Sequence, residues 1–195
     1  MNTGLAMDTD QIKTGDESLP TTAASLLAQL TALGIAYRLY HHQPVFTVEE
    51  SLEIERDMPG AHCRNLFVRD KKDQMFLVVA QNETMIDLKK LSTLLDCGRL
   101  SFGSPERLWT YLGVRPGSVC PFAITNDKGN DVTIVLDQSM MAHDIVNYHP
   151  MENHMTIGLA PADLIRFIEQ TGHAPWILDL TPAAPDAKAD ESETT

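Results

Sequence analysis

The segment GAHCRNLFVRDKK, residues 60–72, carries the side chains with the clearest chemical potential in this chain. A small-residue loop leads into Cys63, Arg64 and Asn65, and an apolar run follows them. Arg64 is interpreted either as the working cation of an active site or as a solvated charge where a strand begins. Cys63 is interpreted either as a thiolate stabilised by the neighbouring cation or as a small packing residue. No histidine is placed by sequence to act as its base, which favours packing.

Three histidines, His143, His149 and His154, fall within 12 residues and suggest a metal site. Their spacings of six and five do not place them on one face of a helix or strand. The chain also lacks GxGxxG, Walker, GxSxG and HExxH signatures. We therefore expect loop or pocket histidines, no metal and no cofactor.

The segment YLGVRPGSV, residues 111–119, places two glycines and a proline between a predicted helix and a predicted strand. Its composition favours a plain turn. The functional alternative is a loop whose backbone approaches a ligand closely, which glycine permits.

The net charge of -12 opposes nucleic-acid binding, because Lys and Arg drive contact with phosphate. Residues 1–20 and 181–195 each carry four acids and one Lys, a charge of -3 each, so the body between them carries -6. Within that body Arg64, Arg69, Lys71 and Lys72 are close enough in sequence to form a basic patch. A solvated hairpin explains these four residues equally well.

The 195 residues, 43% hydrophobic and 22% charged, predict one soluble globular domain over residues 21–180. The polar, acidic ends predict a disordered leader over 1–20 and a disordered tail over 181–195, and removing them should leave the fold intact. No apolar stretch approaches the roughly 18 residues of a membrane span, and the N-terminus has no signal-peptide pattern. Three widely spaced cysteines suit reduced thiols, so we expect a cytoplasmic protein.

Helices and strands alternate along the body. Capping and spacing signals predict helices at 21–34, from Thr47 to before Pro59, at 88–96 after Asp87, from Ser104 to Gly113, and at 160–172. Apolar runs predict strands at 35–40, 65–70, 75–80, 120–125, 132–137 and 175–180, with hairpins joining 65–80 and 120–137. The predicted fold class is α/β, with a mixed, mainly antiparallel sheet and surrounding helices.

Six segments in chain order carry a resemblance to a known family: HHQPVFTVEES, MPGAHCRNLFVRDKK, FLVVA, TMIDLKKLSTLL, GRLSFGSPERLWTYLGVRPGSV and VNYHPMENHMT. Together they resemble the YbaK/ProX group of aminoacyl-tRNA editing proteins, most of all its free-standing ProXp-ala (PrdX-like) branch of prolyl-tRNA synthetase-associated domains. The resemblance runs from about residue 22 to 180 and implies the editing-domain fold of that family.

The resemblance also implies an activity. Family members act in trans as deacylases, and this branch removes alanine wrongly attached to proline tRNA. A synthetase pocket built for proline cannot firmly exclude a smaller amino acid, because missing methylenes change discrimination by only ~1–3 kcal/mol. The implied partners are the acceptor end of mischarged tRNA and prolyl-tRNA synthetase, with no membrane.

The family motif transfers roles to particular residues. HCRNLF corresponds to the usual H-T-K-N-L-F, so Arg64 takes the place of the functional lysine and Asn65 matches the asparagine beside it. Arginine keeps the charge but does not readily give up a proton. The alternative function is therefore a catalytically weak module of the same fold that binds tRNA or an aminoacyl ligand.

The remaining transferred positions are expected to bind substrate. His149 in NYHP matches a pocket histidine that limits amino-acid size. Gly113, Pro116 and Gly117 match a glycine-proline loop near the aminoacyl ester. Lys71 and Lys72 are candidates for holding the acceptor stem, with a solvated turn as the alternative.

Overall fold

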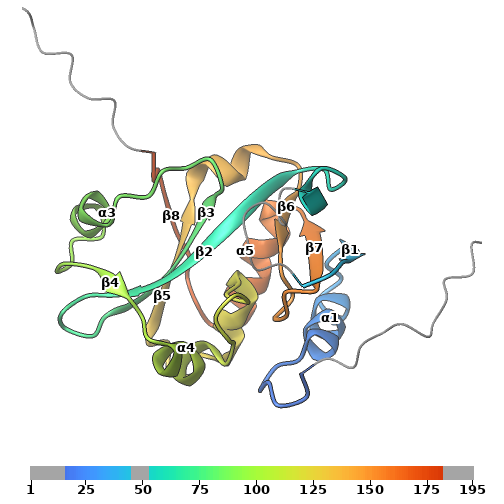
Figure 1. Ribbon diagram of the computed structural model, residues 1–195, viewed down its shortest axis with the longest axis horizontal. Helices are drawn as coiled ribbons and strands as arrows, with labels where there is room; N and C mark the ends of the chain where they lie inside the picture. Colours follow the sequence, from blue (N-terminus) through green and yellow to red (C-terminus); the bar gives the residue numbers. More distant parts are fainter. Residues whose placement is uncertain (1–15, 45–52, 182–195) are drawn as a thin grey trace, which may run out of the picture.

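A computed structural model describes residues 16–44 and 53–181 of the chain (Figure 1). In this part of the chain one eight-stranded sheet has the order β1-β7-β6-β2-β3-β5-β8, and β4 pairs with β2 outside that path. The strands are β1 Tyr37–His41, β2 Ala61–Arg69, β3 Met75–Gln81, β4 Ser101–Phe102, β5 Val132–Asp137, β6 Val146–Tyr148, β7 Met155–Leu159 and β8 Trp176–Leu178. Among the elements that lie wholly in the described residues, the helices are α1 Ala23–Ala32, α3 Leu88–Leu94, α4 Pro105–Leu112 and α5 Pro161–Gln170, and the 3₁₀ helices are η2 Pro121–Asn126 and η3 Gln138–Ala142. Residues 53–55 are helical as well.

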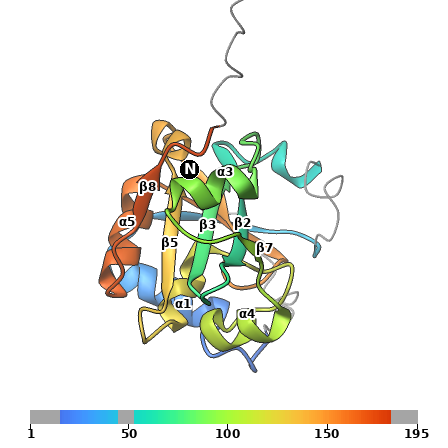
Figure 2. The same ribbon diagram turned by 90° about the vertical axis from the view of Figure 1, so that its left-hand side faces the viewer.

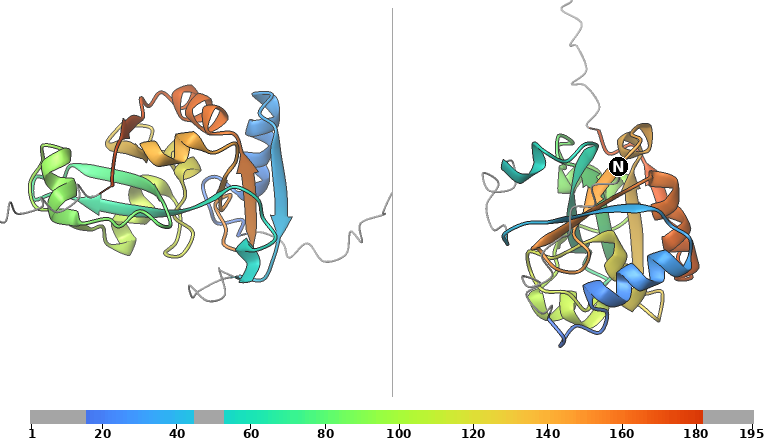
Figure 3. Two further views of the ribbon diagram at one scale, coloured as in Figure 1. Left: turned by 90° about the horizontal axis from the view of Figure 1, so that it is seen from above. Right: turned by 90° about the vertical axis from the view of Figure 1, so that its right-hand side faces the viewer.

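The predicted fold class is confirmed. The pairs β1–β7, β2–β3, β2–β4 and β6–β7 are antiparallel, whereas β2–β6, β3–β5 and β5–β8 are parallel. Figure 2 shows β5, β3 and β2 side by side, as this register requires. Seen from above in Figure 3, α3 lies at one end of the molecule and α1 with β1 at the other.

The sheet separates two apolar cores because neighbouring strand residues point to opposite faces. On β3, Leu77 and Val79 face the larger core, together with side chains from α1, α4, α5 and η2. Phe76 and Val78 face the smaller core under α3. Both faces of β3 are therefore buried, which explains why its sequence reads as one continuous apolar run.

Local capping signals predicted the helix ends well. The Asp87 carboxylate accepts hydrogen bonds from the N–H groups of Lys89 (2.8 Å) and Lys90 (3.3 Å) at the start of α3. Ser104 caps α4, and Gly113 ends it with a φ of 61°. A left-handed residue at that position favours glycine, as the sequence indicated. The predicted Thr47–Glu50 capping box lies outside the described residues.

The second predicted hairpin is wrong. Residues 121–126 form η2 instead of a strand, and β5 pairs in parallel with β3 and β8. Pro121 at the first turn suits a helix, while all of residues 121–125 are buried without the alternation of a half-exposed strand. Asp127 then holds the following turn by accepting hydrogen bonds from the N–H groups of Asp131 (3.2 Å) and Val132 (2.7 Å).

The predicted leader is too long at its C-terminal end. Leu19 is only 6% exposed and belongs to the larger core. The Asp16 N–H donates to Glu152 (3.1 Å), and the Asp16 carboxylate accepts a hydrogen bond from Arg115 (2.9 Å). Residues 16–20 therefore belong to the packed body.

Two truncated chains test whether residues 16–20 stabilise the fold. We expect a chain that begins at residue 21 to be less stable than one that begins at residue 16 by about 2–5 kcal/mol in free energy of unfolding, the cost of emptying a buried leucine site. Urea denaturation of the two chains measures the difference. Equal midpoints and slopes would show that Leu19 contributes nothing to the core.

Candidate functional site

One edge of β2 is paired only at its two ends. On that edge β6 pairs with residues 61–62 and β4 with residues 68–69. The opposite edge pairs with β3 from Cys63 to Arg69. Residues 63–67 thus face no strand within the described part of the chain, and we call this stretch the open edge of β2.

The main chain of Asn65 points toward this open edge. The Ala61 N–H donates to the Ile145 carbonyl (2.9 Å), and the Phe67 carbonyl accepts from the Gly103 N–H (2.9 Å), both on the same side of β2. Backbone groups alternate in direction along a strand, so odd-numbered residues face that side. The N–H and C=O of Asn65, midway between Ala61 and Phe67, consequently face the open edge.

Arg64 is a half-buried cation held by main-chain carbonyls. It lies opposite Ala80 of β3, on the face of the smaller core. Its Nη2 donates to the carbonyl oxygens of Asn82 and Thr84, in the loop that follows β3. Its Nε is buried and has no hydrogen-bond partner among the described residues. The position inside β2 and these contacts argue against a freely solvated charge at the start of a strand.

The Asn65 side chain points to the opposite face from Arg64. It lies opposite Val79, which belongs to the larger core. Its Oδ1 is buried and lacks a hydrogen-bond partner in the described part of the chain. The structure therefore does not bring the Asn65 side chain beside the Arg64 guanidinium, although the two residues are adjacent in sequence.

His149 follows β6 and has a defined tautomer. Its Nδ1 lies 2.8 Å from the Met155 carbonyl oxygen, which can only accept, so Nδ1 carries the proton. Nε2 of the neutral ring is then an acceptor. Burial lowers the pKa of His149 from its ordinary value of 6.5, and the bond to Met155 opposes that shift. The His42 ring, 5.9 Å away between centroids, favours the neutral form as well.

Glu55 links the surroundings of His149 and Arg64. Strand β6 pairs in parallel with β2, with Asn147 opposite His62, and His149 and Arg64 each follow two residues later along the chain. The Glu55 carboxylate raises the pKa of His149, against the effect of burial. It also lies 3.4 Å from Nδ2 of Asn82, whose carbonyl accepts from Arg64. The structure thus brings Arg64 and His149 into one neighbourhood.

The pKa of His149 leads to a pH prediction. Because its folded pKa lies below the unfolded value of 6.5, the unfolded chain binds more protons as pH falls, and stability is lost. We expect wild type to lose more unfolding free energy than His149→Gln between about pH 7 and about pH 5. Urea titrations of both proteins at the two pH values measure this. Equal losses would contradict a lowered pKa.

The glycine-proline loop divides into a buried and an exposed part. Gly113 is buried, and a Cβ there would meet Pro20 and Asn126, so this glycine serves helix packing. Pro116 and Gly117 are exposed, and Gly117 has a φ of 89°. A Cβ on Gly117 would lie 3.9 Å from Nδ2 of Asn153, in the turn between β6 and β7 that also carries His149. Gly117, at the exposed end of the loop, thus adjoins the His149 turn.

Residues 42–167 match the family model of the aminoacyl-tRNA editing domain, a span of well over half the chain. This chain belongs to that family. The family predicted from the sequence is confirmed.

Named relatives agree with this editing-domain assignment. The prolyl-tRNA editing protein ProX of Acetoanaerobium sticklandii is 37% identical over 150 residues, which cover 76% of this chain and 92% of ProX. Prolyl-tRNA synthetase associated domain-containing protein 1 of Danio rerio is 38% identical over 151 residues, covering 76% of this chain and 82% of that protein. A crystal structure of a proposed trans-editing enzyme for prolyl tRNA synthetase matches with a TM-score of 0.64 at 18% identity, over 83% of this chain and 98% of that one. At that identity the last match supports the fold alone.

Lys71 and Lys72 lie far from the Arg64 end of this editing domain. Both are exposed in the turn between β2 and β3. At about 3.3 Å per strand residue they lie roughly 20 Å along β2 from Arg64. The Asp70 carboxylate shapes their turn by accepting from the N–H groups of Lys72 (2.7 Å) and Gln74 (3.0 Å). The structure does not bring these lysines to Arg64 or His149.

The cysteine and the other two histidines singled out from the sequence each contact a neighbouring side chain. Burial raises the pKa of Cys63 to about 12, and its Sγ lies 3.4 Å from the sulfur of Met140. A thiol with this pKa is not a nucleophile, so packing is the better interpretation. His143 contacts Gln81 (3.2 Å) and His154 contacts Glu152 (3.7 Å). Within the described ranges no group of three His, Cys, Asp or Glu side chains could hold a metal.

Sequence reasoning missed the residues that hold Arg64. Asn82 and Thr84 supply the two carbonyls, and neither was a candidate. A usable signal was present, because the polar stretch QNET directly follows the buried run MFLVVA. Polar residues just beyond the end of a buried strand are well placed to build a site.

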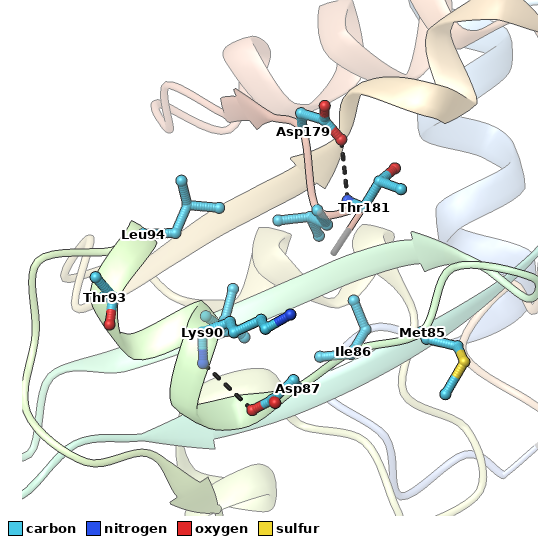
Figure 4. A pocket seen from close by; sticks show the side chains of 10 residues that line it. Met85, Ile86, Asp87, Lys90, Thr93, Leu94, Asp179 and Thr181 are labelled. Carbon is cyan, nitrogen blue, oxygen red and sulfur yellow. Dashed lines mark hydrogen bonds between the residues drawn. The ribbon is translucent and has the colours of Figure 1, made fainter. Parts of the chain in front are cut away.

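A separate apolar pocket of about 350 Å³ lies between α3 and the segment after β8 (Figure 4). Met85, Ile86, Leu94 and Leu180 contribute its apolar lining, with Lys90 and Asp179 beside them. None of the predicted site residues lines it. None of the helices in the described ranges has the length and the apolar composition that a membrane span requires.

Proposed function

We propose that this editing domain hydrolyses the ester bond of mischarged tRNA, with Ala-tRNA(Pro) as its main substrate. The observation that carries the proposal is the anchored Arg64 guanidinium beside the open edge of β2. Its Nη2 is occupied by two carbonyls, and its buried Nε lacks a partner among the described residues. A buried donor without a partner costs free energy, which a substrate oxygen would recover.

The reaction needs an oxyanion to be stabilised. The oxygen of a water molecule bonds to the ester carbonyl carbon, the bond to the ribose oxygen breaks, and that oxygen takes a proton. Alanine and free tRNA leave. Arg64 remains protonated throughout, so it acts by charge and hydrogen bonding and not as a base. A fixed cation at the developing negative charge is an effective way to lower such a barrier.

Asn65 contributes most directly through its main chain in this proposal. Its N–H and C=O face the open edge of β2, whereas its side chain lies on the face away from Arg64. A ligand lying along the open edge accepts a hydrogen bond from the Asn65 N–H, as an added strand would. Arg64 and Asn65 then reach one ligand from a strand face and a strand edge.

His149 limits the size of the amino acid. Its neutral ring is held at Nδ1 by the Met155 carbonyl, so its position is fixed and Nε2 can accept a hydrogen bond from the substrate's ammonium group. A rigid wall beyond the β-carbon admits alanine and disfavours proline. This is the second selection step that a proline-activating pocket needs, because that pocket cannot firmly exclude a smaller side chain.

Once the ester is placed beside Arg64 and His149, the contacts of the rest of the tRNA can be proposed. Pro116 and Gly117, next to the His149 turn, approach the terminal nucleotide, and Gly113 supports them from within the fold. Lys71 and Lys72, at the far end of the β2–β3 hairpin, contact phosphates of the acceptor stem. The proposed protein partner is prolyl-tRNA synthetase, which produces the mischarged tRNA. The proposed location of the protein is the cytoplasm. The chemistry requires no metal or cofactor.

A panel of mischarged tRNAs tests the function. We expect Ala-tRNA(Pro) to be deacylated well above its spontaneous rate, Pro-tRNA(Pro) to be spared, and excess chelator to leave the rate unchanged. Binding of Ala-tRNA(Pro) without acceleration of its hydrolysis would support a binding module instead. No acceleration for any ester in the panel would refute the proposal.

A further inference from the structure

Asp137 is a fully buried carboxylate at the end of β5. It is 0% exposed. Three neutral donors reach it: Thr84 Oγ1 (2.6 Å), Ser139 Oγ (2.7 Å) and the Ser139 N–H (3.2 Å). Burying a carboxylate is costly, and the hydrogen bonds offset part of that cost. Capping the end of β5 alone does not explain a carboxylate that is so costly to bury.

The two sides of Asp137 serve different parts of the fold. On one side, Ser139 and Asp137 begin η3, whose Met140 packs against Cys63. On the other side, Thr84 donates its hydroxyl to Asp137 while its main-chain carbonyl accepts from the Arg64 guanidinium. Thr84 is 9% exposed, so its side chain has little freedom to find another partner. Asp137 therefore connects to Arg64 through a single residue.

We propose that Asp137 is a positioning residue of the editing site and holds Arg64 in its working orientation through Thr84. With Thr84 fixed, both hydrogens of Arg64 Nη2 remain on the carbonyls of Asn82 and Thr84, and the Nε–H keeps one direction. Without that tie, the loop at residues 82–84 is free to shift, and the guanidinium shifts with it. This inference rests on the proposed function for its effect on rate, but its structural part is measurable without any substrate.

The hydroxyl of Thr84 is the connection to remove. Thr84→Val keeps the shape and the main-chain carbonyl, and Thr84→Ala is a smaller variant in case valine prevents folding beside the carboxylate. Thr84→Ser keeps the hydroxyl and should behave as wild type. Ser139→Ala is the matched control, because it removes a donor from the same Asp137 oxygen without touching the loop that holds Arg64.

The direct measurement is the NMR signal of the Arg64 Nε–H in protein labelled with ¹⁵N-arginine, assigned by its loss in Arg64→Lys. In wild type we expect slower exchange with water than for the exposed Arg56. In Thr84→Val or Thr84→Ala the exchange of Arg64 should accelerate at least ~10-fold, and in Ser139→Ala by much less. Unprotected Arg64 in wild type, or unchanged exchange in both Thr84 variants, would overturn the proposal.

The activity measurement separates positioning from general stability. We expect kcat/KM for Ala-tRNA(Pro) to fall about 10-fold in Thr84→Val, and Thr84→Val to have no further effect once Arg64 is alanine. Full additivity of the two substitutions would overturn the positioning role. If Arg64 loosens as expected while wild type cleaves no ester in the panel, the proposed function fails and the structural link stands.

Discussion

Replacing Arg64 with alanine should lower deacylation of Ala-tRNA(Pro) at least ~10-fold, the low end of losing one charge-assisted contact to a reacting group. The substitution removes both the cation and the buried Nε donor, and it leaves the carbonyls of Asn82 and Thr84 without their donor. Single-turnover rates at saturating enzyme measure the chemical step apart from tRNA binding. A melting curve of each protein shows whether the fold survives.

Two further variants make that result specific. Arg69→Ala removes another half-buried arginine of β2, one that contacts Asp73 (3.6 Å) at the far end of the strand, and should leave the rate nearly unchanged. Arg64→Lys restores the family's usual side chain. An ammonium has three donors, enough for two carbonyls and one ligand, so we expect equal or faster deacylation. Wild-type rates in Arg64→Ala would exclude Arg64 from the mechanism.

The parts of the fold that were predictable from the sequence are those set by local chemistry. Asp87 and Ser104 cap α3 and α4 as expected, because a cap involves residues only two or three positions apart. The strand predicted at 120–125 failed for the opposite reason. Whether that run pairs with β5 depends on β3 and β8, which occupy both edges of β5 from distant parts of the chain.

The candidate site shows the same division between local and distant contacts. Arg64 and His149 were found through a family motif, and the parallel pairing of β2 with β6 brings both into one neighbourhood. Arg64 and Asn65 were both candidates from the family motif, and the strand was predicted to begin only at residue 65. Once the strand starts at Ala61, adjacent residues must point to opposite faces. The tie from Thr84 to Asp137 joins residues 53 positions apart, which no local pattern indicates.

His149→Ala should admit larger esters and shift selectivity from alanine toward proline. The imidazole is half-buried and held by the Met155 carbonyl, so its removal opens space that the fold does not readily refill. Space for a few methylenes changes discrimination by only ~1–3 kcal/mol, so we expect the rate on Pro-tRNA(Pro) relative to Ala-tRNA(Pro) to rise by roughly 10- to 200-fold at most. Deacylation rates on both tRNAs give this ratio directly.

The control for this change is His149→Gln, which keeps most of the side-chain volume and a donor for the Met155 carbonyl. Its Pro-to-Ala rate ratio should stay near that of wild type, even if both rates fall. The competing interpretation is that His149 only packs the turn before Pro150, a buried residue. In that case His149→Ala would lower the melting temperature and both rates together. An unaltered rate ratio in the alanine variant would therefore remove His149 from the pocket wall, because a wall acts on the difference between two substrates and packing acts on both alike.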